Sequence, residues 1–437
     1  MIADRTSASM TQRALVFFFV VILLGALGCD EASSTPVDEA APPGQTVRSS
    51  KPRLSTEVPA EDTRQLTSDN AAFGFDVMKQ AAARDNFFVS PHSISLALAM
   101  TYAGARGETA AQMAQALRFT LADERLHAAF GALDLELARR ADKALESGQA
   151  FELNVLNAIW GQRGYQLLAP YLDLLAERYG AGLSLLDFAS DPEAARATIN
   201  GWVSDRTATR IPELIARGVV NPATVLVLTN AIYFKASWAA PFEPKETAEG
   251  LFTRLDGAPT AAQLMRQTKE HRYARGEGWQ ALELRYAGDD VSMLVLLPDS
   301  GQFEGFRASL DGARLSAITG ALGSKLVSVT LPRFTFRTQL PVKAILRALG
   351  MIDAFQGGVA DFSGMDGGRS LFIQDVVHEA FVAVDEKGTE AAAATAVVVG
   401  RVSVPELATF TADRPFLVVI RDEPTGAVLF LGQVTSL

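Results

Sequence analysis

The segment of this sequence with the clearest chemical meaning lies near the C-terminus, at residues 385–396, and reads DEKGTEAAAATA. It follows a strand-like run at residues 380–384 and contains no large apolar side chain. A segment of this kind cannot hold itself in a core, and as an exposed loop it is a target for proteases. Alanine and threonine are also small enough to fit between two strands of a sheet. The composition therefore predicts a loop that a protease can cut and that can afterwards act as a strand.

The spacing within this hinge segment supports the same interpretation. Gly388 lets the chain bend, and alternate residues after it face one side of a strand. The charged side chain that follows the bend, Glu390, faces outward. An alanine-rich helix is the alternative, but Thr395 and the valines after it oppose a helix. The inward-facing residues are Thr389, Ala391, Ala393 and Thr395, and the whole hinge comprises Glu386, Lys387, Gly388, Thr389, Glu390, Ala391, Ala392, Ala393, Ala394 and Thr395.

Motifs for catalysis or metal binding are missing from the sequence. There is no HExxH, CxxC or GxSxG pattern and no glycine-rich phosphate loop. A Ser–His–Asp triad is defined by geometry and not by spacing, so His378 with Ser90 or Ser93 is the pair to inspect. We expect a protein that is not an enzyme and that uses neither a metal nor a cofactor. None of the four histidines has metal-ligand spacing: they are His92, His127, His271 and His378.

Three further motifs accompany the hinge along the chain. Residues 90–94 read SPHSI, residues 229–238 read TNAIYFKASW, and residues 410–417 read FTADRPFL. Together with the hinge they resemble the serpin family, and the resemblance runs from about Asn70 to the C-terminus. It implies an α+β serpin fold, in which helices pack around a large central β-sheet with two smaller sheets and an exposed reactive loop.

The same resemblance implies a function. Serpins inhibit serine and, in some cases, cysteine endopeptidases as suicide substrates: the protease cuts the reactive loop, and the loop then inserts into the central sheet. The implied partner is a target protease. The alternative is a non-inhibitory, membrane-anchored lipoprotein of serpin fold that binds a ligand or partner.

Two groups of residues match the devices with which the family opens its sheet. A buried polar cluster, the shutter, must be satisfied before and after a strand enters, since an unsatisfied buried donor costs about 1–3 kcal/mol. Trp238 matches the breach, where the loop first enters, with Glu386 and Lys387 opposite. The alternatives are an ordinary core histidine for His378 and an ordinary core aromatic for Trp238, the role that we expect for Trp202. The residues that match the shutter are Ser90, Ser93, Asn230 and His378.

Counting along the loop places the reactive bond between Val402 and Ser403. Val402 lies sixteen residues after Glu386, which is the family's usual spacing between hinge and cleavage site. Counting eight residues back from Phe410, which opens the C-terminal motif, gives the same bond. Valine suits the small apolar primary pocket of an elastase-like protease. The alternative bond joins Arg401 to Val402, and a trypsin-like protease would choose it.

The elements that must position these residues follow from hydrophobic periodicity. Helical spacing dominates the first half of the chain and strand patterns the second, which favours an α+β fold over alternating βαβ units. Helices are expected at residues 70–83, 93–105, 124–145, 167–179, 192–207 and 340–349, and strands at 151–160, 225–234, 281–286, 291–297, 326–336, 416–420 and 427–434.

The N-terminal region predicts export. An apolar run of signal-peptide length at residues 14–24 follows Arg13. It closes with GALGC, which resembles a bacterial lipobox, so Cys29 is expected to carry lipid and to become the mature N-terminus. An uncleaved membrane anchor is the alternative. The start codon is Met1 or Met10.

The chain then divides into three parts. Residues 1–28 are the expected lipoprotein signal peptide. Residues 29–67, rich in Pro, Ser, Thr, Glu and Ala, are expected to form a disordered tether. Residues 68–437 are the expected serpin domain. The protein would be exported and lipid-anchored to the bacterial cell envelope.

Composition limits the partners. The chain of 437 residues is 48% hydrophobic, which is enough for a large core. Cys29 is its single cysteine, so no intrachain disulfide can form. A net charge of −10 argues against nucleic acid or a polyanion such as heparin as the main partner. We expect a monomer that binds a target protease and, through Cys29, a membrane.

Overall fold

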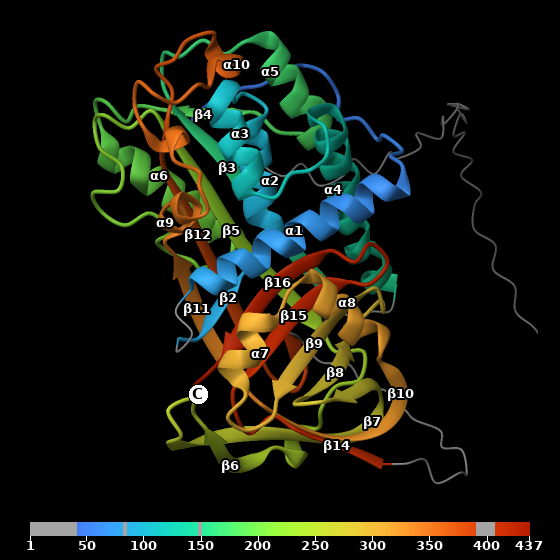
Figure 1. Ribbon diagram of the computed structural model, residues 1–437. Helices are drawn as coiled ribbons and strands as arrows, with labels where there is room; N and C mark the ends of the chain where they lie inside the picture. The colour runs from blue at the N-terminus through green and yellow to red at the C-terminus, as the bar shows by residue number, and fades with distance from the viewer. Residues whose placement is uncertain (1–41, 82–84, 147–150, 390–406) are drawn as a thin grey trace, which may run out of the picture. The chain divides into compact units, whose positions relative to one another are not determined.

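Two β-sheets and the helices around them form the unit Pro42–Leu437 (Figure 1). The computed structural model describes residues 42–81, 85–146, 151–389 and 407–437. The first sheet has seven strands, in the order β1 (Gln45–Val47), β4 (Leu183–Leu186), β3 (Phe151–Gln162), β5 (Leu226–Ser237), β13 (Gly388–Thr389), β12 (Ile373–Val384) and β11 (Phe334–Leu340).

The second sheet has nine strands, and it unites the two smaller sheets that the sequence predicted. The long strand β7 joins them, because it pairs with β6 along its first part, with β10 from Leu264 to Tyr273 and with β8 at its end. The strands are β14 (Leu407–Thr411), β10 (Gly323–Pro332), β7 (Pro259–Gly276), β8 (Trp279–Arg285), β9 (Val291–Pro298), β15 (Phe416–Asp422), β16 (Val428–Val434) and β2 (Phe87–Val89), with β6 (Ala248–Thr253) on β7.

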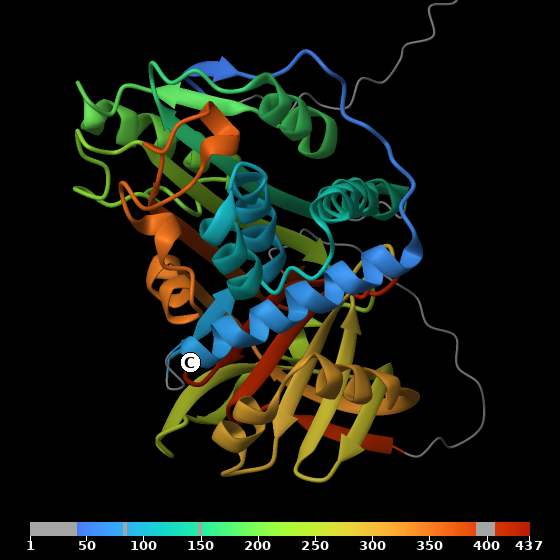
Figure 2. The same ribbon diagram turned by 45° about the horizontal axis from the view of Figure 1, so that its top comes forward.

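The helices precede most of the strands, as predicted for an α+β chain. α1 runs obliquely across the unit in both views (Figures 1 and 2). The longer helices are α1 (Ala60–Gln80), α2 (Pro91–Tyr102), α3 (Gly107–Ala116), α4 (Asp123–Glu146), α6 (Pro192–Arg206) and α8 (Gly312–Gly320). The shorter ones are α5 (Ala169–Leu174), α7 (Phe303–Ser309), α9 (Val342–Ala348) and α10 (Ser363–Asp366), with single turns at η1 (Leu175–Tyr179), η2 (Pro244–Glu246) and η3 (Asp353–Phe355).

Helix α1 begins ten residues before its predicted start at residue 70. The added turns carry carboxylates that interrupt the apolar pattern, and each finds a partner from another part of the chain. The Asp62 side chain accepts hydrogen bonds from Arg125, and Asp69 accepts one from the Thr120 hydroxyl at 2.7 Å. Hydrophobic periodicity cannot reveal such contacts between distant parts of the chain.

The predicted disordered tether, residues 29–67, extends too far along the chain. From Pro42 onward the segment is ordered: β1 pairs antiparallel with the edge strand β4. Lys51 then lies 3.1 Å from Asp173, and Arg53 forms an ion pair with Asp134. A polar composition predicted disorder, but a sheet edge and acidic side chains on two helices hold this segment in place. The tether prediction is therefore wrong for residues 42–67, and residues 29–41 lie outside the described residues.

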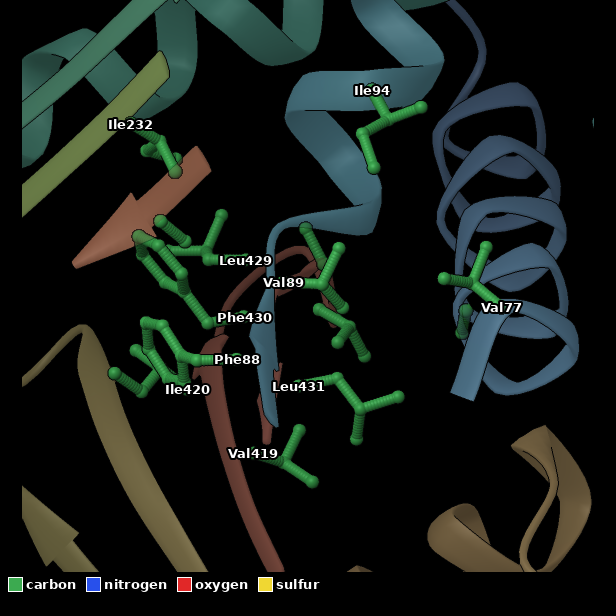
Figure 3. Packing of buried hydrophobic residues seen from close by; sticks show 14 of the residues in the cluster. Val77, Phe88, Val89, Ile94, Ile232, Val419, Ile420, Leu429, Phe430 and Leu431 are labelled. Carbon is green, nitrogen blue, oxygen red and sulfur yellow. The ribbon is translucent and has the colours of Figure 1, made fainter. Parts of the chain in front are cut away.

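The core forms where the two sheets and the first helices meet. Figure 3 shows Phe88 of β2 beside Phe430 of β16, with Ile232 of β5 and Ile94 of α2 pointing into the same region. The two phenyl rings stack with centroids 4.8 Å apart. This packing fixes α2 and β5 relative to one another, and both elements contribute to the site described below.

A second apolar cluster lies between the first sheet and α6. Trp202 of α6 is 8% exposed and meets Trp160 of β3 edge to face at 5.5 Å. The expectation that Trp202 is a core residue is confirmed. Within the described residues, the helices are all too short or too polar to cross a membrane.

Candidate functional site at the gap between two central strands

The centre of the first sheet contains two parallel strands that part at one end. β5 and β12 pair from Leu226 with Ile373 to Tyr233 with Phe381. Beyond that point β13 lies between them and is antiparallel to both. Gly388 and Thr389 of the predicted hinge therefore already occupy the gap, and a strand that continued from them would run between β5 and β12.

Gly388 fits this gap because it has no side chain. A Cβ atom at this position would stand 2.0 Å from the carbonyl oxygen of Ala236 and 2.8 Å from the Cα atom of Ser237. The backbone also adopts a φ of +155°. Glycine is thus required for the close approach of the hinge to β5.

Thr389 faces the interior, as the period-two rule predicted. Its side chain is 1% exposed, and its Oγ1 atom lies 2.8 Å from the hydroxyl of Tyr286 in a hydrogen bond. Tyr286 comes directly after β8 and stacks on Trp238, with ring centroids 4.5 Å apart and planes 13° apart. Sequence reasoning did not identify Tyr286.

Trp238 lies beside the turn that leads into the hinge. Its Nε1–H donates to the carbonyl of Asp385 at 2.9 Å, and its backbone N–H donates to the carbonyl of Lys387 at 2.8 Å. The Asp385 carboxylate accepts hydrogen bonds from the backbone N–H groups of Lys387 and Gly388. The turn is therefore held from both sides.

Glu386 anchors the same turn with its side chain. The carboxylate is 4% exposed and accepts a hydrogen bond from Arg333 Nε at 2.7 Å and another from the Thr247 hydroxyl. Burial alone would raise the pKa of Glu386, but the hydrogen bonds from Arg333 and Thr247 outweigh it and hold the pKa below its ordinary value. Arg333 and Thr247 carried no signal in the sequence, because both lie far from Glu386 along the chain.

The four residues that match the shutter come together beneath the sheet, with a fifth that the sequence analysis missed. Asn230 of β5 is in register with Asn157 of β3 and with His378 of β12. Its Nδ2–H donates to Ser93 Oγ at 2.5 Å and also to Asn157 Oδ1, while its Oδ1 pairs with His378 Nδ1. The backbone N–H of Ser90 donates to His378 Nε2 at 3.4 Å.

This arrangement excludes a Ser–His–Asp triad at His378. A triad needs a serine hydroxyl on one imidazole nitrogen and a carboxylate on the other. Here the ring nitrogens meet a backbone amide and a side-chain amide. The Ser90 hydroxyl instead accepts a hydrogen bond from the backbone N–H of Ser93 at 3.1 Å. The described residues also contain no group of three or more His, Cys, Asp or Glu side chains that could hold a metal ion.

His378 is neutral in this cluster. Because Nε2 accepts a hydrogen bond, Nδ1 carries the proton and donates to Asn230. Complete burial lowers the pKa of His378 to about 3. The cluster is therefore a network of neutral amides, hydroxyls and one neutral imidazole joined by mutual hydrogen bonds. Within the part of the chain that the structure describes, the buried Nδ2 group of Asn157 has no hydrogen-bond partner.

The other predicted site residues lie outside the described residues. These are the rest of the hinge, Glu390, Ala391, Ala392, Ala393, Ala394 and Thr395, the residues of the two alternative reactive bonds, Arg401, Val402 and Ser403, and the lipidation residue, Cys29.

Comparisons with known proteins agree with this geometry. Residues 68–437 match the family model described as serpin (serine protease inhibitor). An uncharacterized serpin-like protein of Thermococcus kodakarensis is 39% identical over 369 residues, which cover 84% of each chain. The human leukocyte elastase inhibitor is 37% identical over 384 residues, which cover 85% of this chain and 99% of that protein.

A solved structure shares the fold. The crystal structure of tengpin, a thermophilic serpin in its native state, matches with a TM-score of 0.78 and 28% sequence identity. The match covers 90% of this chain and 98% of that one.

The lowered pKa of His378 predicts a loss of stability in acid. The unfolded chain binds a proton at this histidine below its ordinary pKa of 6.5, whereas the folded protein resists protonation down to about 3. Stability from this group is thus complete above pH 6.5 and falls by about 1.4 kcal/mol per pH unit below it. Urea midpoints between pH 7 and 5 should fall more steeply in the wild type than in His378→Gln. Equal slopes would contradict the assignment, and the comparison removes the contributions of the other histidines, His92, His127 and His271, which also have lowered pKa values.

Proposed function

This chain belongs to the serpin family, and we propose that it inhibits a serine or cysteine endopeptidase as a suicide substrate whose cut loop inserts into the central sheet. The family is one of protease inhibitors and not of enzymes. The observation that carries the proposal is the placement of Gly388 and Thr389 between β5 and β12, at the start of the path that an inserting loop would follow.

The loop is long enough for the path. Two of the 12 residues of β5 already pair with β13, so ten remain beyond it, which corresponds to about 33 Å at roughly 3.3 Å per residue. Thirteen residues run from Glu390 to Val402, which span about 43 Å when extended. A loop cut after Val402 could therefore fill the gap and carry an attached protease from one end of the sheet to the other.

The energetics favour insertion once the loop is cut. The eight-residue parallel contact between β5 and β12 would be exchanged for two antiparallel contacts, which are slightly more stable per residue. About a dozen backbone groups would gain partners, at roughly 0.5–1.5 kcal/mol each, so the gain is on the order of 10 kcal/mol. The uncut fold is then a kinetic trap, held because the loop is tied at both ends.

Inhibition follows from a race between two steps. The protease nucleophile attacks the carbonyl carbon of Val402, an ester or thioester forms, and the amine of Ser403 leaves. Water would normally hydrolyse this acyl-enzyme. Insertion instead moves the protease away from its docking site before hydrolysis is complete, and the covalent complex persists.

The bond between Val402 and Ser403 remains the proposed reactive bond. The count of sixteen residues to Val402 starts at Glu386, and the hydrogen bond from Arg333 holds Glu386 just before the hinge enters the gap between β5 and β12. Valine favours an elastase-like target, and a relative at 37% identity bears the name leukocyte elastase inhibitor. A trypsin-like target that cuts after Arg401 is the alternative.

We also propose that the protein is a lipoprotein of the bacterial cell envelope, anchored through Cys29. The support is the order of signal-like run, lipobox-like motif and polar segment in the sequence. In this proposal residues 29–41 would link Cys29 to the unit that begins at Pro42.

The first prediction from this proposal concerns insertion. Thr389→Arg should turn the inhibitor into a substrate, because a long cation would have to occupy an interior position that is 1% exposed, at a cost of several kcal/mol, about 2–7 for an unpaired polar group. Glu390→Arg is the matched control, since the same side chain would face outward. The yield of SDS-resistant complex with an elastase-like protease should collapse only for Thr389→Arg. Equal yields would contradict insertion, and clean loop cleavage without complex in the wild type would favour the non-inhibitory binding lipoprotein.

The second prediction identifies the bond. The C-terminal fragment released when the covalent complex forms should begin at Ser403, which intact-mass measurement resolves. A fragment that begins at Val402 would move the target class to trypsin-like proteases.

The third prediction concerns the anchor. Cys29→Ser should release the protein from membranes or block its processing, because the serine cannot accept the thioether-linked lipid. Membrane fractionation with mass measurement of the mature chain tests this. A Cys29→Ser protein that stays membrane-bound at unchanged mass would refute lipidation without affecting the proposed inhibition.

A further inference from the structure

Tyr286 is placed where the hinge of the uncut protein meets the sheet. Its ring is fully buried between Trp238 and Phe234, stacked on the first and edge-on to the second at 5.0 Å. The ring therefore cannot turn away from the gap. Its hydroxyl is directed at Thr389, 2.8 Å from Oγ1.

The hydrogen bond joins the hinge to a part of the molecule that insertion would not need to move. Tyr286 directly follows β8 of the second sheet, and its backbone bridges to Trp238. Thr389 belongs to β13, whose other contacts are with the two strands that must separate. The Tyr286 hydroxyl thus holds the hinge by a hydrogen bond from a fixed side chain, at the end of the sheet where β5 and β12 part.

This contact also distinguishes one strand register from its neighbours. Side chains along a strand alternate between faces, so a slip of one residue would turn Thr389 outward and present Glu390 to the buried tyrosine. A carboxylate in that apolar pocket would be strongly disfavoured. Gly388 enforces the same register, because only glycine fits against the Ala236 carbonyl.

We propose that Tyr286 is a positioning residue that holds Thr389 in the sheet before cleavage and fixes the register in which the loop inserts. The effect of Tyr286 on inhibition rests on the proposed function, whereas the hydrogen bond between Tyr286 and Thr389 does not. A docked hinge has already separated β5 from β12 at their ends. Insertion after cleavage then extends a strand that is already paired. A hinge that is not docked must first pair with β5 and β12, and the acyl-enzyme can be hydrolysed during this delay.

The test removes the two hydroxyls separately and together. In Tyr286→Phe and in Thr389→Val, amide hydrogen exchange of the peptide covering residues 385–389 should accelerate about two- to tenfold, the factor that one neutral hydrogen bond supports. The double variant should match the single variants, because both remove the same bond. Thr389→Ser should restore slow exchange. Tyr273→Phe, which loses a hydroxyl bonded to Gln280, is the control and should leave the hinge unchanged.

The functional readout is the number of inhibitor molecules consumed per protease molecule inactivated. It should rise in Tyr286→Phe and Thr389→Val and stay near the wild-type value in Thr389→Ser. Unchanged exchange, additive effects in the double variant, or unchanged consumption in Tyr286→Phe would overturn the positioning role. If the wild type forms no covalent complex at all, the proposed function fails, and the exchange data still decide whether Tyr286 holds the hinge.

Discussion

The parallel pairing of β5 with β12 is the interaction on which the rest of the structure depends. It closes the centre of the first sheet, yet it is a short contact that ends at Tyr233 and Phe381, where the strands part around β13. Parallel strands have no hairpin between them, so a third strand can enter without breaking the chain. The first sheet can therefore open between β5 and β12, and the hinge lies at the end where these two strands part.

The buried polar cluster sits on the same pair of strands and couples hydrogen bonding to their separation. Asn230 and His378 face one another across the β5–β12 contact, and a strand placed between them would separate the two side chains. Each unsatisfied buried group costs about 1–3 kcal/mol. Asn157 and Ser93, which already contact Asn230, are the groups with which it can remain paired when the strands part. The cluster thus resists opening and yet leaves Asn230 with partners after it.

Much of the fold and part of the site could be predicted from the sequence, and the failures have physical causes. The hinge glycine, the inward threonine and the tryptophan beside them carry local signals in residue size and spacing. Asn157 and Tyr286 carry none, because an amide or a phenol in a strand is meaningful only beside its neighbour in the sheet. The order of residues 42–59 was missed for a similar reason. Its polar side chains are typical of a disordered segment. Their partners, Asp134 and Asp173, lie on helices that are distant in the sequence.

The extent to which the hinge is already inserted could not be read from the sequence either, because it depends on the fit of Gly388 against Ala236 and not on composition. The central claim is that the cut loop completes this insertion, and one measurement tests it. Calorimetry should be run on the intact protein and on protein whose loop has been cut by a non-target protease near Val402. The account predicts that cleavage raises the unfolding midpoint by roughly 10 °C or more, since the freed segment becomes a strand of the sheet. An unchanged or lowered midpoint would mean that the loop does not insert, and would contradict the account.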